Sequence, residues 1–244
     1  MTDSVVIQRI VDTIVPRPDE LFIEIGPGQA ALTRPLIDTG MELHLVEIDR
    51  DLADRLAKQF RIHPGVHVHV GDALKMDFAA ISGESPFRLV GNLPYNISTP
   101  LLFHVLNWSE LIIDMHFMLQ SEVVNRMAAS PGTKAWGRLS IMCQYHCKVI
   151  PLFTVQAESF TPVPKVQSGI VRLIPHRDPP VQIASKESFD QLVTQAFSMR
   201  RKTLRNSLRN MLDVSLIESA GIDPGLRADA LGLEQFAALS NLME

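Results

Sequence analysis

The chain has 244 residues, of which 46% are hydrophobic and 20% charged. This composition excludes a disordered, collagen-like or coiled-coil protein and allows one large domain, or one ordinary domain with an appendage. No apolar run approaches the ~18 residues of a membrane span, no secretory signal opens the sequence, and 2 cysteines are too few for a disulfide scaffold, so we expect a soluble, cytoplasmic protein. The net charge of -4 hides a basic segment near the C-terminus.

Short apolar runs rich in Val, Ile and Phe alternate with helix-like stretches, which is the pattern of successive βαβ units. The predicted strands are Leu21–Ile25, Glu42–Glu47, Val66–Val70, Phe87–Gly91, Ile113–Leu119, Val149–Val155 and Gly169–Ile174. The predicted helices between them are Asp49–Arg61, Ser98–Asn107, Gln120–Ala129 and Gly137–His146. Such crossovers favour a seven-stranded, mostly parallel α/β sheet with helices on both faces. The last two strands leave no room for a crossover helix, so we expect them to be antiparallel neighbours.

Three prolines within residues 174–180 interrupt this pattern and indicate a linker. We therefore predict an α/β domain over residues 1–177 and a small all-helical C-terminal domain over residues 178–244. The helices expected in the second domain are Ser188–Met199, Arg201–Leu212 and Leu233–Leu242.

A glycine-rich turn follows the first predicted strand. Gly26 and Gly28 allow a tight turn that leaves room for a ligand against the main chain, and the next helix is expected to start near Thr33. Glu47 ends the second strand about 20 residues later, where a carboxylate can accept both hydroxyls of a ribose. Asp72, which follows the third strand, supplies an acceptor near the position of an adenine amino group. The glycine pattern alone is weak, but together these residues predict a nucleoside-containing ligand.

The motif Asn92-Leu-Pro-Tyr95 ends the fourth strand. It brings together an amide oxygen, the backbone carbonyl of Pro94 and an aromatic face. Two acceptors can take the two N–H bonds of an exocyclic amine while the Tyr95 ring stacks on the base. A dehydrogenase has no use for such a group. The alternative, a proline turn with a packed tyrosine, is a poor account of the motif in this position.

At this point the sequence resembles the ribosomal RNA adenine dimethyltransferases of the KsgA type, over nearly its whole length. The resemblance is carried by Ile23-Glu-Ile-Gly-Pro-Gly28, Val46-Glu-Ile-Asp49, Gly71-Asp72, Gly91–Ser98, Phe160–Val166 with Ser168, and Arg200–Thr203 with Arg205-Asn-Ser207. The erythromycin-resistance methyltransferases share the catalytic half of these motifs but generally diverge in the C-terminal half.

The resemblance implies a Rossmann-like class I methyltransferase that uses S-adenosylmethionine. It also implies dimethylation of N6 on two adjacent adenosines in a hairpin near the 3′ end of small-subunit rRNA, within a pre-ribosomal small subunit, by a protein that we expect to be a monomer. Alternatives are a large-subunit rRNA or DNA methyltransferase and a non-catalytic ribosome-assembly or transcription factor.

Residue roles follow from the same resemblance. The cofactor site is expected to contain Gly26, Gly28, Glu47, Asp72 and Asn92. Asn92 and Pro94 would hold the target N6, and the flipped base would stack between Tyr95 and Phe160; a core position for Phe160 is an equal alternative. Relatives also carry a basic segment ahead of the first helix that closes one wall of the cofactor pocket, whereas this sequence opens at the cap of that helix.

The basic segment near the C-terminus consists of Arg200, Arg201, Lys202, Arg205 and Arg209. On a continuous helix, three of its arginines would recur every four residues beside an apolar stripe of Leu204, Leu208 and Leu212. We predict that the leucines dock on the protein and that the basic segment binds RNA phosphates. The alternative is a solvated face or a set of ion pairs with acidic residues of the protein.

Two other groups of residues could suggest a metal. His67 and His69 alternate on one strand, and Cys143, His146 and Cys147 cluster on a helix. Neither group supplies enough ligands at the spacing of a zinc site. We interpret both groups as core or edge packing and predict no metal.

Overall fold

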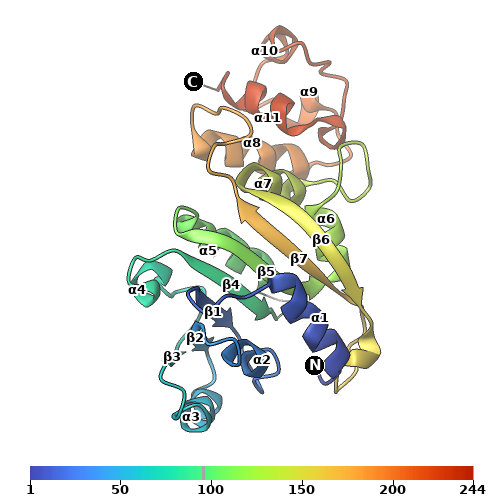
Figure 1. Cartoon of the computed structure of the whole chain (residues 1–244). Coiled ribbons are helices and arrows are strands. Elements are labelled where there is room, and N and C mark those ends of the chain that lie inside the picture. Colours follow the sequence, from blue (N-terminus) through green and yellow to red (C-terminus); the bar gives the residue numbers. More distant parts are fainter. Residues whose placement is uncertain (95–96, 244) are drawn as a thin grey trace. The chain divides into compact units, whose positions relative to one another are not determined.

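The computed structural model describes residues 1–94 and 97–243 (Figure 1). The chain forms two compact units, one of Met1–Val124 with Ile150–Pro175 and one of Asn125–Val149 with His176–Glu244. Within the described residues, no helix has both the length and the apolar character needed to cross a bilayer.

A seven-stranded sheet dominates the first unit, with the strand order β3-β2-β1-β4-β5-β7-β6. Its strands are β1 (Leu21–Ile25), β2 (Glu42–Glu47), β3 (Val66–Val70), β4 (Phe87–Asn92), β5 (Ile112–Gln120), β6 (Cys147–Val155) and β7 (Ser168–Pro175). The first five strands pair in parallel, whereas β7 runs antiparallel to β5. Figure 1 shows β6 and β7 side by side in opposite directions. The predicted strands and the antiparallel last pair are therefore confirmed.

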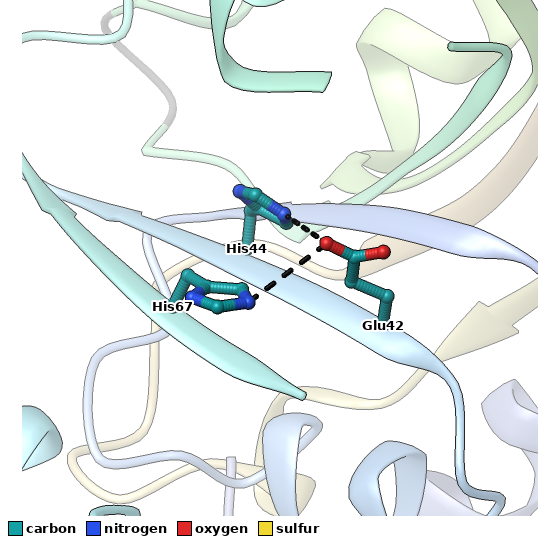
Figure 2. Close-up of side chains that lie close together, drawn as sticks. All are labelled: Glu42, His44 and His67. Carbon is teal, nitrogen blue, oxygen red and sulfur yellow. Dashed lines mark hydrogen bonds and ion pairs between the residues drawn. The ribbon is translucent and has the colours of Figure 1, made fainter. Parts of the chain in front are cut away.

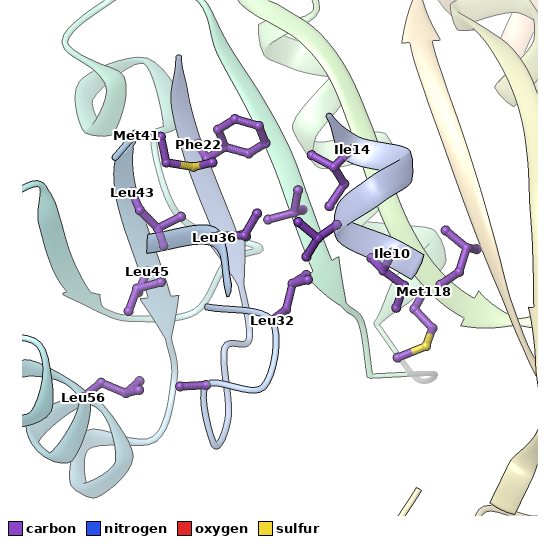
Figure 3. Packing of buried hydrophobic residues seen from close by; sticks show 14 of the residues in the cluster. Ile10, Ile14, Phe22, Leu32, Leu36, Met41, Leu43, Leu45, Leu56 and Met118 are labelled. Carbon is purple, nitrogen blue, oxygen red and sulfur yellow. The ribbon is translucent and has the colours of Figure 1, made fainter. Parts of the chain in front are cut away.

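Helices cover both faces of this sheet. The first unit contains α1 (Ser4–Ile14), α2 (Thr33–Ile37), α3 (Arg50–Gln59), α4 (Phe78–Ser82), α5 (Ser98–Val105) and most of α6 (Ser121–Met127). Ile10 and Ile14 of α1 join Leu36 of α2 and Phe22 of β1 in one buried cluster (Figure 3). Side chains alternate along a strand, and Phe22 is in register with Arg88, so Phe87 lies on the opposite face. There its ring meets Phe78 of α4, which gives the doubly wound arrangement that the sequence predicts.

A buried ion network crosses the sheet beside this core. Asp114 on β5 has no exposed surface and accepts hydrogen bonds from Arg88 Nε at 2.7 Å and from Arg172 Nε at 2.9 Å. The Arg88 guanidinium also donates to Glu20 at 2.9 Å and to the Ile14 carbonyl at 2.8 Å. The network thus links β4, β5 and β7 with the end of α1. Its charges are compensated inside the protein, as burial requires.

The second unit is helical. It contains α7 (Arg138–His146), α8 (Lys186–Ser198), α9 (Leu204–Ser207), α10 (Val214–Ser219) and α11 (Leu233–Ser240). Residues 125–149 belong to it because Trp136 Nε1 donates to the Leu231 carbonyl at 2.9 Å and Arg138 pairs with Asp190 at 2.7 Å. This division differs from the boundary predicted at residue 177, which followed chain order alone.

The predicted helix Arg201–Leu212 is wrong, since only Leu204–Ser207 are helical. The backbone around Thr203 instead forms an isolated bridge to Arg227, and Leu204 and Arg205 donate to carbonyls of Leu226 and Pro224. These hydrogen bonds to residues 224–227 fix the backbone of residues 203–205, where the longer helix was predicted. The docking of the leucines is confirmed, because Leu204, Leu208 and Leu212 are all buried.

Candidate active site

The carboxyl ends of β1 to β4 lie at one edge of the parallel sheet, and the predicted cofactor residues gather there. Gly26 and Gly28 directly follow β1, Glu47 ends β2, Asp72 follows β3 and Asn92 ends β4. In open parallel sheets this edge is where ligands bind. The strand order confirms the doubly wound framework on which the site prediction depended.

The glycine turn adopts a conformation that favours glycine. Gly26 and Gly28 have φ values of 67° and 56°, in the left-handed region. The Gly26 N–H donates to the Val46 carbonyl on β2 at 2.9 Å, which anchors the turn to the neighbouring strand. A Cβ added to Gly26 would meet no atom within 4 Å. The turn therefore has open space beside its backbone, as a ligand site needs.

Glu47 holds this turn from the end of β2. Its side chain is only 6% exposed. One carboxylate oxygen accepts the Gly28 N–H at 3.3 Å and the other accepts the Asp49 N–H at 3.1 Å. A carboxylate offers about four acceptor positions, so both oxygens keep capacity for further donors such as ribose hydroxyls.

Glu24 is a site residue for which the sequence analysis predicted no role. It lies on β1, is 2% exposed, and accepts a hydrogen bond from the Thr33 hydroxyl at 2.6 Å. Burial raises its pKa to about 7 against the lowering effect of that hydrogen bond, and the charge of Glu47 adds to the rise. The hydrogen bond ties the start of α2 to β1 and so closes the glycine turn. Its signal in the sequence was a carboxylate on an otherwise apolar strand.

Asp72 and Gly91 complete the edge. Asp72 is half-buried and accepts the Leu74 N–H at 3.0 Å, which fixes the loop after β3. At Gly91 on β4, an added Cβ would lie 2.6 Å from the Ile25 carbonyl oxygen. Only glycine lets β4 approach β1 this closely, which brings Asn92 beside the end of β1.

A hollow lies next to Asn92. It has a volume of about 290 Å³ and is lined by two segments of the chain: Asn92, Leu93 and Pro94, and Phe160, Pro162 and Pro164. Ligand pockets commonly measure ~300–1,000 Å³, so this volume suits one ring system rather than a large molecule. Asn92 and Pro94 are exposed, and the Pro94 carbonyl accepts the Ile97 N–H at 3.2 Å. A carbonyl oxygen has two lone pairs, so one stays available.

The structure describes only one of the two aromatic residues predicted to stack on the base. Phe160 is 8% exposed and belongs to the buried cluster that includes Met118 and Ile170, while it also lines the hollow. The core position of Phe160 is therefore confirmed, and its stacking on a base stays a prediction. Tyr95 lies outside the described residues.

The basic segment belongs to the second unit. All five of its side chains are exposed, and Arg200 also donates to the Lys134 carbonyl. Among the described residues, no carboxylate forms an ion pair with Arg201, Lys202, Arg205 or Arg209. The described ion pairs therefore give no support to the alternative in which acidic residues of the chain neutralise these cations.

Glu42, His44 and His67 come together on β2 and β3 (Figure 2), and His69 lies beside His44. Only His67 and His69 stand out in the sequence, because the pairing of two strands is not visible in either strand alone. Burial lowers the pKa of His44 against the hydrogen bond to Glu42, and also lowers that of His69. Repulsion from neighbouring histidines adds to the lowering of both pKa values.

Comparison with known proteins identifies the family. The sequence model described as Ribosomal RNA adenine dimethylase matches residues 1–244. The chain belongs to the ribosomal RNA adenine dimethylase family. The predicted family, and with it the activity of an S-adenosylmethionine-dependent rRNA adenine dimethyltransferase, is confirmed.

Relatives within the family cover nearly all of this adenine dimethylase. The Ribosomal RNA small subunit methyltransferase A of Chromohalobacter salexigens is 53% identical over 246 residues, which cover 99% of this chain and 87% of the relative. The protein of the same name from Hydrogenovibrio crunogenus is 52% identical, over 97% of this chain and 91% of its own.

Two solved structures also align with this adenine dimethylase. A dimethyladenosine transferase from Plasmodium falciparum has a TM-score of 0.85 at 25% identity, over 98% of this chain and 95% of its own. The 23S rRNA methyltransferase ErmE has a TM-score of 0.77 at 28% identity, over 100% and 98%. The fold prediction of a class I methyltransferase is thereby confirmed.

The residues at the sheet edge fit the cofactor of this adenine dimethylase, S-adenosylmethionine. The open space beside Gly26 leaves room at the glycine turn, and the buried Glu47 carboxylate has acceptor capacity for hydroxyl donors. Asp72 adds an acceptor at the end of β3. The set offers a turn for one end of a nucleoside-containing ligand and acceptors for its polar groups.

Proposed function

We propose that this enzyme, acting as a monomer in the cytoplasm, dimethylates N6 of two adjacent adenosines in the hairpin near the 3′ end of small-subunit rRNA, within a pre-ribosomal small subunit. Two relatives named as small-subunit methyltransferases share about half of its residues, whereas the 23S rRNA methyltransferase ErmE shares 28%. This difference in identity is the observation that carries the small-subunit assignment.

The assignment is tested by supplying radiolabelled cofactor with small subunits, free small-subunit rRNA, large-subunit rRNA and DNA in parallel, and then mapping the methylated base. We expect dimethylation of two adjacent adenosines in the small-subunit samples. Transfer to large-subunit rRNA or DNA instead would contradict the assignment. Absence of transfer to every acceptor would favour a non-catalytic assembly factor, and sedimentation of the free enzyme tests the monomer.

The Asn92 motif performs the chemistry in this proposal. S-adenosylmethionine supplies a methyl group that its sulfonium already activates, so the residues of the chain must act on the acceptor. The adenine N6 lone pair is delocalised into the ring. Hydrogen bonds from N6 to the Asn92 amide oxygen and the Pro94 carbonyl would favour a pyramidal nitrogen whose lone pair is free to attack. No strong base is required before the attack.

The hollow beside Asn92 would receive the flipped base. Leaving the base stack costs a few kcal/mol, and stacking on an aromatic ring returns ~1–3 kcal/mol per base. Phe160 lines this hollow, and Tyr95 would supply the second ring. The small volume, about 290 Å³, supports a single base as its occupant.

Replacing Glu47 with alanine should weaken cofactor binding by ~10-fold or more, because each hydrogen bond to a charged group contributes ~1.5–3 kcal/mol. RNA affinity should change little. Calorimetry with the cofactor measures the effect. Asp54→Ala on the exposed side of α3 is the matched control and should bind cofactor like the parent enzyme. Unchanged cofactor affinity in a folded Glu47→Ala enzyme would remove Glu47 from the site.

Replacing Arg201, Arg205 and Arg209 together with alanine should weaken RNA binding across sequences. Each phosphate that the protein no longer neutralises flattens the slope of log affinity against log salt by about one unit, so we expect a change of about 2 to 3 units. Cofactor affinity should stay unchanged, because the cofactor residues belong to the other compact unit. RNA binding measured across a salt series gives the slope.

The matched control for this variant removes three exposed cations from the first unit: Arg55, Lys58 and Arg61, on or directly after α3. The control should keep the parent slope. Equal slopes for the parent enzyme and the folded Arg201, Arg205 and Arg209 variant would show that the basic segment is a solvated surface.

A further inference from the structure

Four polar side chains share one face of β2 and β3, the two strands at the β3 edge of the sheet. Glu42 and His44 are two residues apart on β2, and His67 and His69 are two residues apart on β3, so each pair points to one side of its strand. His44 is directly in register with His67. The two pairs therefore lie on the same face, where Figure 2 shows the His44 and His67 rings turned toward the Glu42 carboxylate.

The spacing of the ligand atoms is close to that around a tetrahedral metal. The Glu42 carboxylate oxygen lies 3.1 Å from His44 Nε2 and 3.8 Å from His67 Nε2, and the three atoms lie within 4.8 Å of one another. Ligands bound to zinc at ~2.0–2.1 Å in a tetrahedron are ~3.4 Å apart. The side chains of Glu42 and His67 are 52% and 46% exposed, so small rotations can close the remaining gap.

His69 orients the innermost of these ligands. Its Nε2 lies 2.8 Å from His44 Nδ1, and the two rings stack with centroids 5.0 Å apart and an angle of 8°. A metal-binding histidine almost always donates its other ring N–H to an acceptor, commonly a carboxylate, a backbone carbonyl or water, which fixes the tautomer and the ring orientation. His69 Nε2 can be that acceptor for His44. A carboxylate only accepts, so in the metal-free protein His44 donates Nε2–H to Glu42. Metal binding uses the other tautomer, in which His44 Nδ1–H donates to His69 and the Nε2 lone pair is directed toward Glu42 and His67.

We propose that Glu42, His44 and His67 bind one divalent transition-metal ion, best matched by Zn²⁺, with water in the exposed fourth position. Two imidazoles and a carboxylate are a ligand set that zinc accepts, whereas Ca²⁺ and Mg²⁺ prefer oxygen ligands alone. The ion joins the edge strand β3 to β2 and so stabilises that edge. Glu42 is five residues before Glu47, ~17 Å along the strand. The ion therefore has no part in methyl transfer, and the inference does not depend on the proposed function.

The proposal is tested by titrating the tag-free, metal-stripped enzyme with ZnCl₂ in a calorimeter. We expect one Zn²⁺ per chain, with binding at least ~10-fold weaker in His67→Gln and in Glu42→Gln. His63→Gln is the matched control, since it removes a histidine four residues from His67 and outside the group, and should bind like the parent. His69→Phe keeps a stacked ring without the acceptor nitrogen and should bind ~10-fold more weakly.

A second readout separates this site from non-specific binding. Zn²⁺ should raise the melting temperature of the parent enzyme and of His63→Gln, but not that of His67→Gln, because an ion that binds only the folded protein stabilises it. Methyl transfer by His67→Gln should match that of the parent. Absence of stoichiometric Zn²⁺ binding, or equal weakening by His63→Gln and His67→Gln, would overturn the proposal.

Discussion

Replacing Asn92 with alanine is expected to lower the turnover number by ~100-fold or more, with a modest change in KM. In the proposed mechanism, the Asn92 amide oxygen is an acceptor whose hydrogen bond strengthens as N6 becomes pyramidal. Removing one such preorganised group typically costs ~10²–10³ in kcat. Steady-state kinetics with small subunits as substrate separate kcat from KM. Near-parent turnover in the variant would refute the proposed role of the motif.

Two controls make this result specific. Asn92 is exposed at the end of β4, so its truncation should leave the melting temperature close to that of the parent. Asn92→Asp retains an acceptor oxygen at the same position and should keep more activity than Asn92→Ala. Equal loss in the two variants would indicate that the amide N–H₂ group, rather than the oxygen, matters for transfer.

Replacing Asp114 with alanine is expected to destabilise the first unit by ~3–5 kcal/mol, because two N–H groups of the buried Arg88 lose their carboxylate acceptor and only Glu20 remains paired with that guanidinium. For a chain of this length, each kcal/mol lowers the melting temperature by ~2–4 °C, so a fall of ~6–20 °C should follow. Urea unfolding and calorimetry measure both quantities. Arg172→Ala is the control: its side chain is 38% exposed and its removal leaves Asp114 paired with Arg88, so its effect should be much smaller.

The same network predicts an acid dependence. Burial alone would raise the pKa of Asp114, but the hydrogen bond from Arg88 and the nearby positive charges outweigh burial and hold the pKa below its usual range. A lowered pKa in the folded state stabilises the protein above the unfolded value, ~4, and this contribution is lost as the pH falls through the folded value. The stability gap between parent and Asp114→Ala should therefore narrow below about pH 4. A stability difference that stays constant below about pH 4 would contradict the pairing of Asp114 with Arg88.

Much of the framework could be predicted because it depends on local patterns. Strands covered by helices read as apolar runs in the sequence, and the observed ends of β1 to β3 match those predicted. Gly26 and Gly28 need left-handed φ values, and Asn92 follows an apolar strand at a position that parallel topology brings to the ligand edge. The site residues were therefore predictable wherever strand order alone gathers them.

The prediction of a helix over Arg201–Leu212 failed for the opposite reason. Its leucines have helical spacing and are buried as expected, but backbone donors of Leu204 and Arg205 find partners around residues 224–226. Helical periodicity reports which side chains are buried, whereas the partners of the backbone depend on distant residues. The exposure of the arginines was still predicted correctly, because it follows from the same periodicity.

By itself, the sequence determined the α/β class, the ends of β1 to β3, the family and the residues at the carboxyl ends of β1 to β4, because each is encoded in short stretches of chain. Only the tertiary structure decided which distant polar groups meet: Glu24 with Thr33, Asp114 with Arg88, and His44 with His67. It also assigned residues 125–149 to the helical unit. These pairings depend on strand register and packing between segments far apart in the chain, which the free energy of the whole fold selects rather than any local pattern.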